Sequence, residues 1–336
     1  HVGEKGRLGA TRLHAEEEGV AALGYTVRNS VFLKNLYARL EQCPNVDLQA
    51  PASVVSIAQQ VDRVDYEYER DSVMEQGSAS LLLAADGSNS AVRQMVSISQ
   101  TEKPYDQAAV IANVACERDH ENWAWERFTE SGPLAMLPLG PKLMAMVYTV
   151  DLVDLEQVLA LDDEQMLAAL QQRFGFRLGH FREIGKRLGF PLTLLESDQQ
   201  YRGRVLMMGN SARTLHPVSG QGFNLALRDI ALLAESLSAG GRLADPGDDQ
   251  LLRNFCATRK SDQRSVVRFT DSLVRLFRGR SPGFSHLRGL GLMALDALPP
   301  ARHLLARQSM GMATRLPNLN TLQAQIRQNF PRDTAS

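Results

Sequence analysis

Residues 205–225 read VLMMGNSARTLHPVSGQGFNL, and this stretch decides the fold. It opens with four apolar residues, Val205–Met208, which predict a short strand buried on both faces. A glycine-rich loop containing His216 and Pro217 follows, and the run Phe223–Leu237 predicts a helix. A strand, a glycine loop and a helix in this order are typical of an α/β sheet that binds a ligand at the carboxyl ends of its strands.

The loop carries groups suited to a polar or anionic ligand. Gly209 allows backbone or ligand to come close, and Asn210 can both donate and accept hydrogen bonds. Gly220-Gln221-Gly222 frees successive amides to point at one target. Because a helix N-terminus carries about half a positive charge, this entry suits phosphate or the anionic edge of a reduced flavin. The alternative is a tight turn without a ligand, and the ordered combination of motifs argues against it.

A second glycine turn follows another apolar run. Ser80–Ala85 predicts a strand buried on both faces, and Asp86-Gly87 comes directly after it. The Asp86 carboxylate can accept hydrogen bonds from ligand or backbone donors. Ser90 suits the N-cap of a short helix that carries Arg93. An ordinary Asp-Gly turn, with Arg93 in solvent, is the alternative that this segment leaves open.

Hydrophobic periodicity predicts the other elements. The predicted helices are Ser30–Leu40, Asp163–Phe174 and most of the chain from Asp248, and the predicted strands are Val46–Leu48, Ser53–Ala58, Val61–Glu69, Ala108–Cys116, Ala124–Thr129, Leu134–Leu139, Leu143–Val150 and Lys186–Leu195. Consecutive strands with short Gly or Pro connections predict an antiparallel sheet.

The composition is that of an ordinary globular protein. Of 336 residues, 44% are hydrophobic and 22% are charged, and the formal net charge of −1 gives no field that would favour nucleic acid. Three cysteines without a CxxC or His/Cys cluster argue against disulfides and a metal site, and they indicate a reducing, cytoplasmic setting. No apolar run reaches the ~18–20 residues that a membrane-spanning helix needs.

The motifs resemble those of a known family. The matching segments are Gly209-Asn210-Ser211-Ala212, Leu215-His216-Pro217, Gly220-Gln221-Gly222-Phe223-Asn224-Leu225, Arg228-Asp229, Asp86-Gly87 with Arg93, Glu126-Arg127-Phe128-Thr129 and Gly132–Pro138. Together they look like the FAD motifs of the class A flavoprotein monooxygenases, over nearly the whole chain. Asn210 stands where the wider family usually has Asp, a departure shared with the UbiH-type ubiquinone-biosynthesis hydroxylases.

The resemblance implies FAD as cofactor, NAD(P)H as co-substrate, and hydroxylation of a polyprenylated phenol with one atom of O₂. The residues that it implies for cofactor binding are Asn29, Asp86, Gly87, Arg93, Gly209, Asn210, Pro217, Gly220, Gln221, Gly222, Phe223 and Asn224. It implies a catalytic contribution from Pro217 beside the flavin and from His216, for which a structural role is the alternative. Leu134–Pro138 would line the ring pocket.

The implied fold class is α/β, with a Rossmann-like FAD-binding domain interleaved with an antiparallel-sheet substrate domain, plus C-terminal helices, as in p-hydroxybenzoate hydroxylase. The expected divisions are substrate-domain strands in 1–23, FAD-binding parts in 24–103 and 196–240, the substrate domain in 104–195, helices in 241–316 and a tail in 317–336 that we expect to be disordered. No GxGxxG occurs in the chain. We therefore expect an FAD-binding domain that is incomplete at its N-terminus.

The helical end is basic. Between Leu251 and Arg315 there are twelve Arg or Lys against three Asp, and an apolar stripe runs from Val266 to Phe277. A basic amphipathic helix lies on an anionic membrane or a partner, or packs on the main domain with a solvated basic face. Because the implied substrate is polyprenylated, we expect peripheral contact with the inner membrane or with a ubiquinone-biosynthesis complex.

Two alternatives stay open. One is a different flavoprotein monooxygenase, or a prenyl reductase with another substrate. The other is a truncated, non-catalytic fragment that acts as an interaction module. Product analysis with a prenylphenol and labelled O₂ tests the first alternative. The intact mass and the visible spectrum of the purified protein test the second, because a bound flavin favours the enzyme and a colourless protein favours the fragment.

Overall fold

The computed structural model describes residues 1–6, 9–129, 131–239, 245–278 and 282–312. They divide into two compact units. The first unit takes its described residues from 1–43, 104–193 and 270–312, and the second takes them from 44–103 and 194–269. Each unit is thus assembled from segments that are far apart in the sequence. The tail predicted from Pro317 lies outside the described residues, and the sequence-based domain boundaries stay a prediction.

The first unit is built on a mostly antiparallel sheet, in which only the pairing of β1 with β8 is parallel among the described strand pairs. Its strands are β7 (Gln100–Cys116, in this unit from Pro104), β8 (Trp125–Thr129), β9 (Gly132–Gly140), β10 (Leu143–Asp151), β11 (Phe181–Ile184), β1 (Val2–Glu4) and β2 (Ala10–Thr11). β10 lies between β7 and β9 and is antiparallel to both, and β9 is antiparallel to β8. The four consecutive antiparallel strands predicted from the sequence are confirmed.

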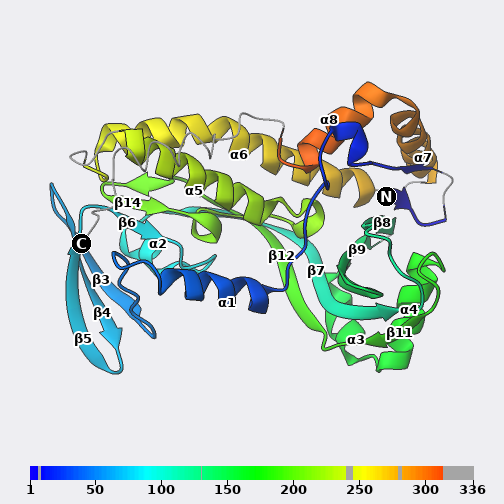
Figure 1. Ribbon diagram of the computed structural model, residues 1–336, viewed down its shortest axis with the longest axis horizontal. Coiled ribbons are helices and arrows are strands. Elements are labelled where there is room, and N and C mark those ends of the chain that lie inside the picture. The colour runs from blue at the N-terminus through cyan, green and yellow to red at the C-terminus, as the bar shows by residue number, and fades with distance from the viewer. Residues whose placement is uncertain (7–8, 130, 240–244, 279–281, 313–336) are drawn as a thin grey trace, which may run out of the picture. The chain divides into compact units, whose positions relative to one another are not determined.

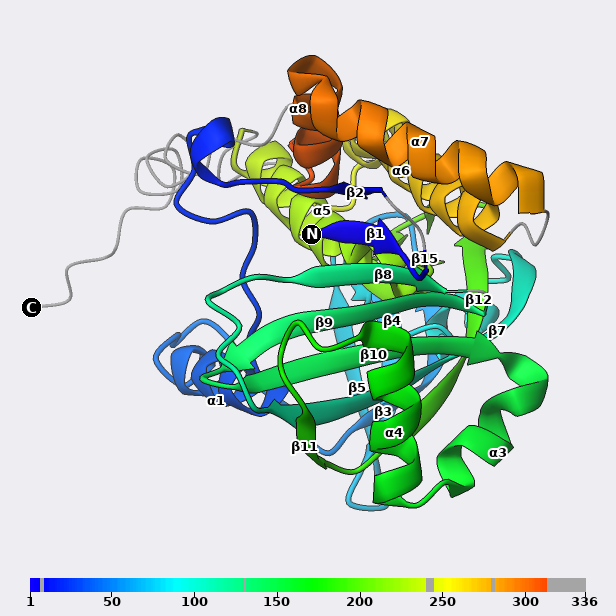
Figure 2. The same cartoon turned by 90° about the vertical axis from the view of Figure 1, so that its right-hand side faces the viewer.

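Helix α4 (Asp163–Phe174) covers one face of this sheet (Figure 2). An Asp162–Gln165 capping box begins the helix. Its buried residues Met166, Leu170 and Phe174 recur every four positions and pack with the inward residues of the strands. The other helices of the unit are α1 (Asn29–Leu40), α3 (Leu155–Ala160), α7 (Pro282–Ala297) and α8 (Pro299–Ser309).

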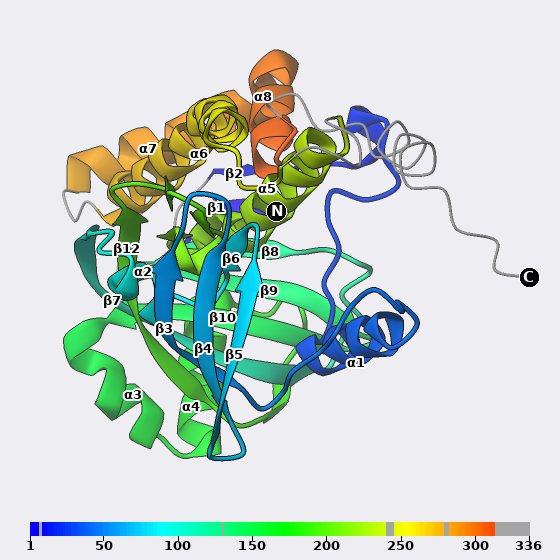
Figure 3. The same cartoon turned by 90° about the vertical axis from the view of Figure 1, so that its left-hand side faces the viewer.

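The second unit contains two small sheets. The first is the antiparallel sheet of β3 (Ser53–Gln59), β4 (Val64–Arg70) and β5 (Val73–Ala79), seen in Figure 3. The second has β14 (Val205–Met207) between β13 (Tyr201–Arg202) and β6 (Leu82–Ala84), with β14 and β6 parallel. β12 (Leu188–Ser197) enters this unit at Leu194 and pairs with β15 (Arg213–Thr214). Helix α2 is Ala91–Met95, and α5 (Gln221–Ala239) runs beside α6 (Asp249–Arg278) in Figure 1.

Strand β14 is buried on both faces, as its sequence predicted. Val205 and Met207 lie in one core with α2 and β6. Leu206 and Met208 lie in another core with α5 and α6. Because successive side chains of a strand point to opposite faces, a strand covered on both sides needs an unbroken apolar run.

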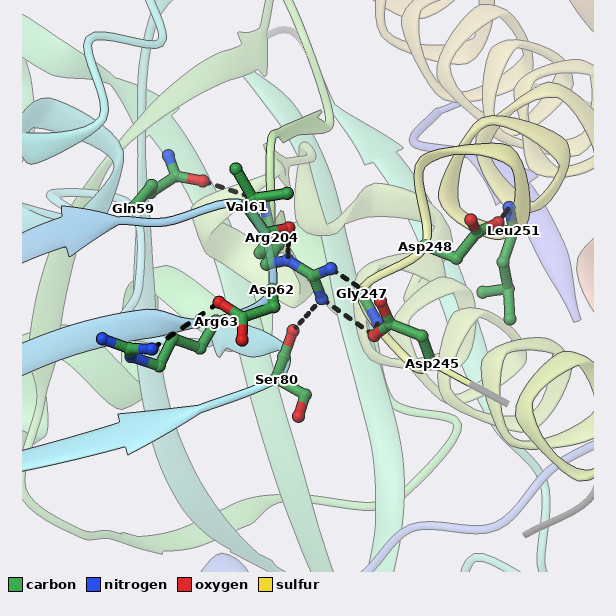
Figure 4. Close-up of polar contacts among 10 residues, drawn as sticks. All are labelled: Gln59, Val61, Asp62, Arg63, Ser80, Arg204, Asp245, Gly247, Asp248 and Leu251. Carbon is green, nitrogen blue, oxygen red and sulfur yellow. Dashed lines mark hydrogen bonds and ion pairs between the residues drawn. The ribbon is translucent and has the colours of Figure 1, made fainter. Parts of the chain in front are cut away.

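Arg204, directly before β14, holds three loops of the second unit together (Figure 4). Its Nε donates to the Val61 carbonyl at 2.8 Å, and Nη1 donates to the Ser80 carbonyl at 2.9 Å. Nη1 and Nη2 also donate to the two carboxylate oxygens of Asp245 at 2.8 and 2.6 Å. This bidentate pair lowers the pKa of Asp245. The side chain thereby fixes the turn before β4, the segment before β6 and the loop before α6.

Two local predictions were wrong, and one strand was missed. Val46–Leu48 forms no strand, because this short run has no neighbouring strand to pair with among the described residues. Leu83 in β6 is 47% exposed, so β6 is not buried on both faces. The sequence analysis also missed β5. Its hairpin turn uses Asp71-Ser72, both with positive φ, in place of the Asn-Gly or Asp-Gly pair that marks such turns.

Candidate flavin-binding site

Two loops leave neighbouring strands at one edge of the second unit's parallel pair. Ala84 of β6 lies opposite Met207 of β14, and the Met208 N–H donates to the Ala84 carbonyl at 2.8 Å. Asp86-Gly87 and Gly209-Asn210 therefore start side by side. The sequence predicted each loop, and the parallel pairing places them together at the carboxyl ends where α/β sheets bind ligands.

The Ser211 side chain joins the ends of both strands. Its hydroxyl is fully buried and lies 2.5 Å from the Ala84 carbonyl oxygen and 2.8 Å from the Met208 carbonyl oxygen. It also accepts from the Met208 N–H at 3.1 Å. A hydroxyl can both donate and accept, so it satisfies both strand ends at once. The sequence analysis gave Ser211 no role of its own, because its partner Ala84 is 127 positions away.

Arg93 links the two loops directly. Its Nη1 donates to the Ser211 carbonyl at 2.9 Å and its Nη2 donates to the Ser88 carbonyl at 2.8 Å. The residue is only 2% exposed, so the alternative of a solvent-exposed Arg93 is wrong. The Arg93 N–H donates to Ser90 Oγ, which confirms Ser90 as the N-cap of α2. These contacts make Arg93 a support for the loops, and direct contact with a cofactor stays a prediction.

The turn at Asp86-Gly87 is shaped by α2. One carboxylate oxygen of Asp86 accepts from the Val92 N–H at 3.1 Å, which adds a second acceptor to the N-terminus of that helix. Gly87 has a φ of 87°, which favours glycine. A Cβ at this position would meet no heavy atom within 4 Å, so the Gly87 backbone borders open space.

The loop before α5 also presents open backbone. Gly209 and Gly220 have φ values of 58° and 59°. A Cβ on Gly220 or Gly222 would meet nothing within 4 Å, and one on Gly209 would meet only the Cβ of Ala226, at 3.9 Å. The Asn210 side chain is exposed and makes no hydrogen bond with another described residue. Glycines bordering free space and an available amide fit an extended polar cofactor that lies against the backbone.

Helix α5 begins at Gln221, two residues earlier than predicted. The amides of a first helical turn have no acceptor within the helix, so those around Gly222 point out of its N-terminus. That turn carries no acidic side chain to cancel the positive end of the helix. Gln221 is buried, whereas Phe223 and Asn224 are exposed. The arrangement suits an anionic or electron-rich group at this end of α5.

His216 and Pro217 form a compact turn between the two motifs. His216 Nδ1 accepts from the Val218 N–H at 3.1 Å, and the Pro217 carbonyl accepts from the Gly220 N–H at 2.9 Å. Burial lowers the pKa of His216 to about 4, so the ring is neutral at pH 7. This geometry gives His216 a structural hydrogen bond. Its catalytic role, and that of Pro217, stay predictions.

Two predicted features belong to the first unit. Asn29 is exposed and is the first residue of α1, so the structure does not group it with the loops of the second unit. In β9, Leu134 and Met136 are fully buried in the sheet core. These two side chains therefore do not line an open pocket. Ala135, Leu137 and Pro138 are half-buried, and their place in a ring pocket stays a prediction.

The site has two glycine loops on parallel strands, and a helix N-terminus without acidic side chains in its first turn follows the second loop. This combination is typical of α/β proteins that bind a nucleotide cofactor. Residues 7–270 match the family model described as FAD binding domain. The chain belongs to this family, and its cofactor is FAD.

Two curated relatives of the chain are ubiquinone-biosynthesis hydroxylases. It is 34% identical to ubiquinone hydroxylase UbiL of Rhodospirillum rubrum over 299 residues, which cover 89% of this chain and 69% of the relative. It is 29% identical to 3-demethoxyubiquinol 3-hydroxylase of Escherichia coli over 299 residues, which cover 89% of this chain and 75% of the relative. The resemblance to the ubiquinone-biosynthesis hydroxylases is confirmed.

Solved structures show the same fold. p-Nitrophenol 4-monooxygenase PnpA from Pseudomonas putida superposes with a TM-score of 0.70 at 17% identity, over 86% of this chain and 74% of that chain. Anhydrotetracycline hydroxylase OxyS from Streptomyces rimosus gives a TM-score of 0.65 at 22% identity, over 87% of this chain and 58% of that chain. The predicted α/β fold class of the flavoprotein hydroxylases is confirmed.

Proposed function

We propose that the protein hydroxylates a polyprenylated phenol in ubiquinone biosynthesis, with NAD(P)H as reductant and O₂ as the source of oxygen. Membership of the FAD binding domain family and the ubiquinone hydroxylases among its relatives support this function. Within that group, the resemblance to the UbiH-type hydroxylases implies 2-octaprenyl-6-methoxyphenol as the substrate type. The structural observation that carries the proposal is the pair of open glycine loops at the carboxyl ends of β6 and β14.

The residues around these loops have separate tasks. Arg93 and Ser211 hold the Asp86-Gly87 turn beside the Gly209-Asn210 turn through buried hydrogen bonds. The open backbone at these turns and the exposed Asn210 amide receive the polar chain of the cofactor. Bound FAD supplies the redox chemistry and the activation of O₂.

The N-terminus of α5 stabilises negative charge on the isoalloxazine ring. Its first-turn amides, near Gly222, point out of the helix, and no acidic side chain of that turn competes with them. His216, held neutral by burial, shapes the preceding turn. Pro217 presents an apolar surface beside the ring, and Phe223 and Asn224 are exposed at the same helix end.

We also propose peripheral membrane contact through α6. None of the helices that the structure describes is both long and apolar enough to cross a bilayer. Part of the apolar stripe of α6 is used in packing, since Val266, Thr270 and Val274 are buried, whereas Leu276 is exposed. Lys260, Arg264 and Arg268 are exposed instead. A basic face of this kind suits the anionic headgroups of the inner membrane, where a polyprenylated substrate resides.

The test is carried out on protein expressed from the complete reading frame. A visible spectrum reports bound FAD, and oxidation of NADH or NADPH is followed with and without a prenylated phenol. Mass spectrometry after reaction under ¹⁸O₂ is expected to show one labelled oxygen in the product ring. Bound FAD with saturation of a prenyl double bond and no labelled oxygen would point to a prenyl reductase, and a protein without flavin would remove the proposal.

A further inference from the structure

Two buried arginines and two buried aspartates join α5 to α6 within the second unit. Arg228 Nε donates to Asp262 Oδ2 at 3.0 Å, and Arg259 Nε donates to Asp229 Oδ1 at 2.5 Å. Arg259 Nη2 also lies 2.6 Å from Asp262 Oδ2. The four side chains are between 4% and 8% exposed. Two positive and two negative charges make this α5–α6 ion cluster neutral as a whole.

In the α5–α6 ion cluster, each helix supplies one arginine and one aspartate. Helix α5 contributes adjacent residues of opposite charge, Arg228 and Asp229, and α6 contributes Arg259 and Asp262, one turn apart. Adjacent residues point roughly 100° apart around a helix, so both pairs form at only one rotation of α5. A slide of α5 by one residue, about 1.5 Å, removes the match between opposite charges. The cluster therefore fixes both the rotation and the axial position of α5.

Burial makes this arrangement close to all-or-none. Desolvation raises the pKa of Asp229, and the Arg259 guanidinium opposes that rise. Gln263 Nε2 lies 3.4 and 3.3 Å from the two Asp229 oxygens and donates to Gln200 Oε1 at 3.1 Å. Breaking one pair removes an opposite charge from a group that is held away from water, which is strongly unfavourable.

Helix α5 connects this cluster to the glycine loops of the candidate site, Asp86-Gly87 and Gly209–Gly222, because its N-terminus lies in the second of them. Its N-terminus at Gln221 lies about two turns, or roughly 10 Å, before Arg228 along a continuous helix. The electrostatic effect of a helix terminus falls off within one turn. A shift of the helix by even one residue therefore changes how strongly its N-terminus stabilises a nearby negative charge. Helix packing alone tolerates such shifts better than paired charges do.

We propose that Arg228, Asp229, Arg259 and Asp262 are positioning residues that set the place of the α5 N-terminus against the anionic edge of reduced FAD. The inference rests on the proposed flavin function. It concerns the reduced cofactor in particular, because reduction adds the negative charge that the helix terminus stabilises.

The first variant is Asp262→Asn, which keeps the side-chain size and removes the carboxylate shared by the two arginines. The second combines Asp229→Leu with Arg259→Met, which replaces one pair by apolar groups that need no partner. Arg253→Gln is the matched control, because Arg253 pairs with Asp249 on the exposed face of the same α6. All are made in protein expressed from the complete reading frame.

We expect about tenfold weaker binding of oxidised FAD in both cluster variants and a further tenfold loss for reduced FAD. That further factor corresponds to a fall of about 30 mV in the two-electron midpoint potential. In the FAD-free protein, amide hydrogen exchange in α5 from Leu225 to Asp229 should become about tenfold faster. Arg253→Gln should leave all three quantities unchanged.

The outcomes separate this inference from the proposed function. A folded cluster variant with unchanged potential and unchanged exchange in α5 overturns the positioning role. If Asp262→Asn does not fold, the apolar double variant decides by the same two measurements. A wild-type protein that binds FAD but hydroxylates no prenylphenol refutes the proposed substrate and leaves the potential as the test. If the wild type binds no FAD, unchanged exchange in α5 overturns the inference alone.

Discussion

The Arg93 guanidinium donates to the carbonyl of Ser211, 118 residues further along the chain, at 2.9 Å. This single side chain couples the two loops, because its other terminal nitrogen binds the Ser88 carbonyl. We expect Arg93→Lys to lose one of the two contacts, since an ammonium group lacks the planar fork of a guanidinium.

The loss should reduce the free energy of unfolding by about 2–3 kcal/mol, in the range of hydrogen bonds to a charged group, and weaken FAD binding by at least tenfold. Urea unfolding and a fluorescence titration with FAD measure the two effects. Arg63→Lys, at a half-exposed arginine, is the control and should change neither quantity. Normal FAD affinity in Arg93→Lys would contradict the coupling.

A second prediction separates ligand contact from backbone strain at the glycines. Gly220 has a positive φ, so any side chain there strains the fold whether or not a ligand is present. Gly222 has no such constraint and borders open space. We therefore expect Gly222→Ala to fold normally and Gly222→Val to abolish flavin retention. The control is Gly291→Ala, at another helical glycine with nothing within 4 Å. Retained flavin in folded Gly222→Val would remove the loop from the cofactor site.

The third prediction concerns pH and His216. The folded pKa of about 4 lies below the ordinary value of 6.5, so the unfolded chain binds the proton more readily between these two values. The free energy of unfolding should therefore rise as pH increases from 4 to 6.5, by roughly 3 kcal/mol, and stay level above. His216→Asn keeps an acceptor for the Val218 N–H but cannot titrate. Urea unfolding across pH should show a smaller slope in that variant, and equal slopes would refute this assignment.

A fourth prediction tests the Arg204 cluster. A Cβ on Gly247 would collide with the Ser80 carbonyl and the Arg204 guanidinium. Gly247→Ala should therefore lower the free energy of unfolding by about 2 kcal/mol, as overpacking does. Gly140→Ala adds the same methyl group where no heavy atom lies within 4 Å, so its effect should be small. Chemical denaturation of the two variants measures the difference, and an equal effect would speak against the close packing.

The last prediction addresses the membrane. Replacing Lys260, Arg264 and Arg268 by Gln should weaken binding to vesicles that contain anionic lipid by roughly a hundredfold at low salt. Sedimentation with neutral and anionic vesicles provides the comparison. FAD content should not change, because these exposed residues point away from the packed side of α6. Equal binding of variant and wild type would assign the basic face to solvent alone.

The local elements were predictable because their signals are local. The apolar run Val205–Met208 predicts cover on both faces, and the four-residue spacing in α4 predicts one buried face. The Asp71-Ser72 turn escaped prediction because its residues reach positive φ without the usual glycine. Leu83 lies in an apolar run, yet cover on its face depends on distant segments that the run does not encode.

The loops of the site could be predicted from the sequence, whereas the side-chain hydrogen bonds that hold these loops in place could not. Glycine spacing identified Gly87 and Gly220 as backbone positions, and both have positive φ values beside open space. Arg93 and Ser211 reach their partners because β6 and β14 pair in parallel, and Arg93 and Ser211 are 118 residues apart in the sequence. No short-range sequence pattern predicts a pairing of that kind. The sequence identified Arg228 and Asp229 only as part of a motif. Their structural role could not be predicted, because it depends on ion pairs with Asp262 and Arg259 of another helix.

The 118-residue separation of Arg93 from Ser211 also orders events during synthesis. At about 5–20 residues per second, the ribosome needs roughly 6–24 s to travel from one to the other. During that interval the whole segment 104–193 emerges, with the antiparallel sheet of the first unit. Until then the Arg93 guanidinium has no Ser211 carbonyl to bind. The Asp86-Gly87 and Gly209-Asn210 loops can therefore be joined only after the whole inserted segment has been synthesised, so a cofactor that needs both loops binds late.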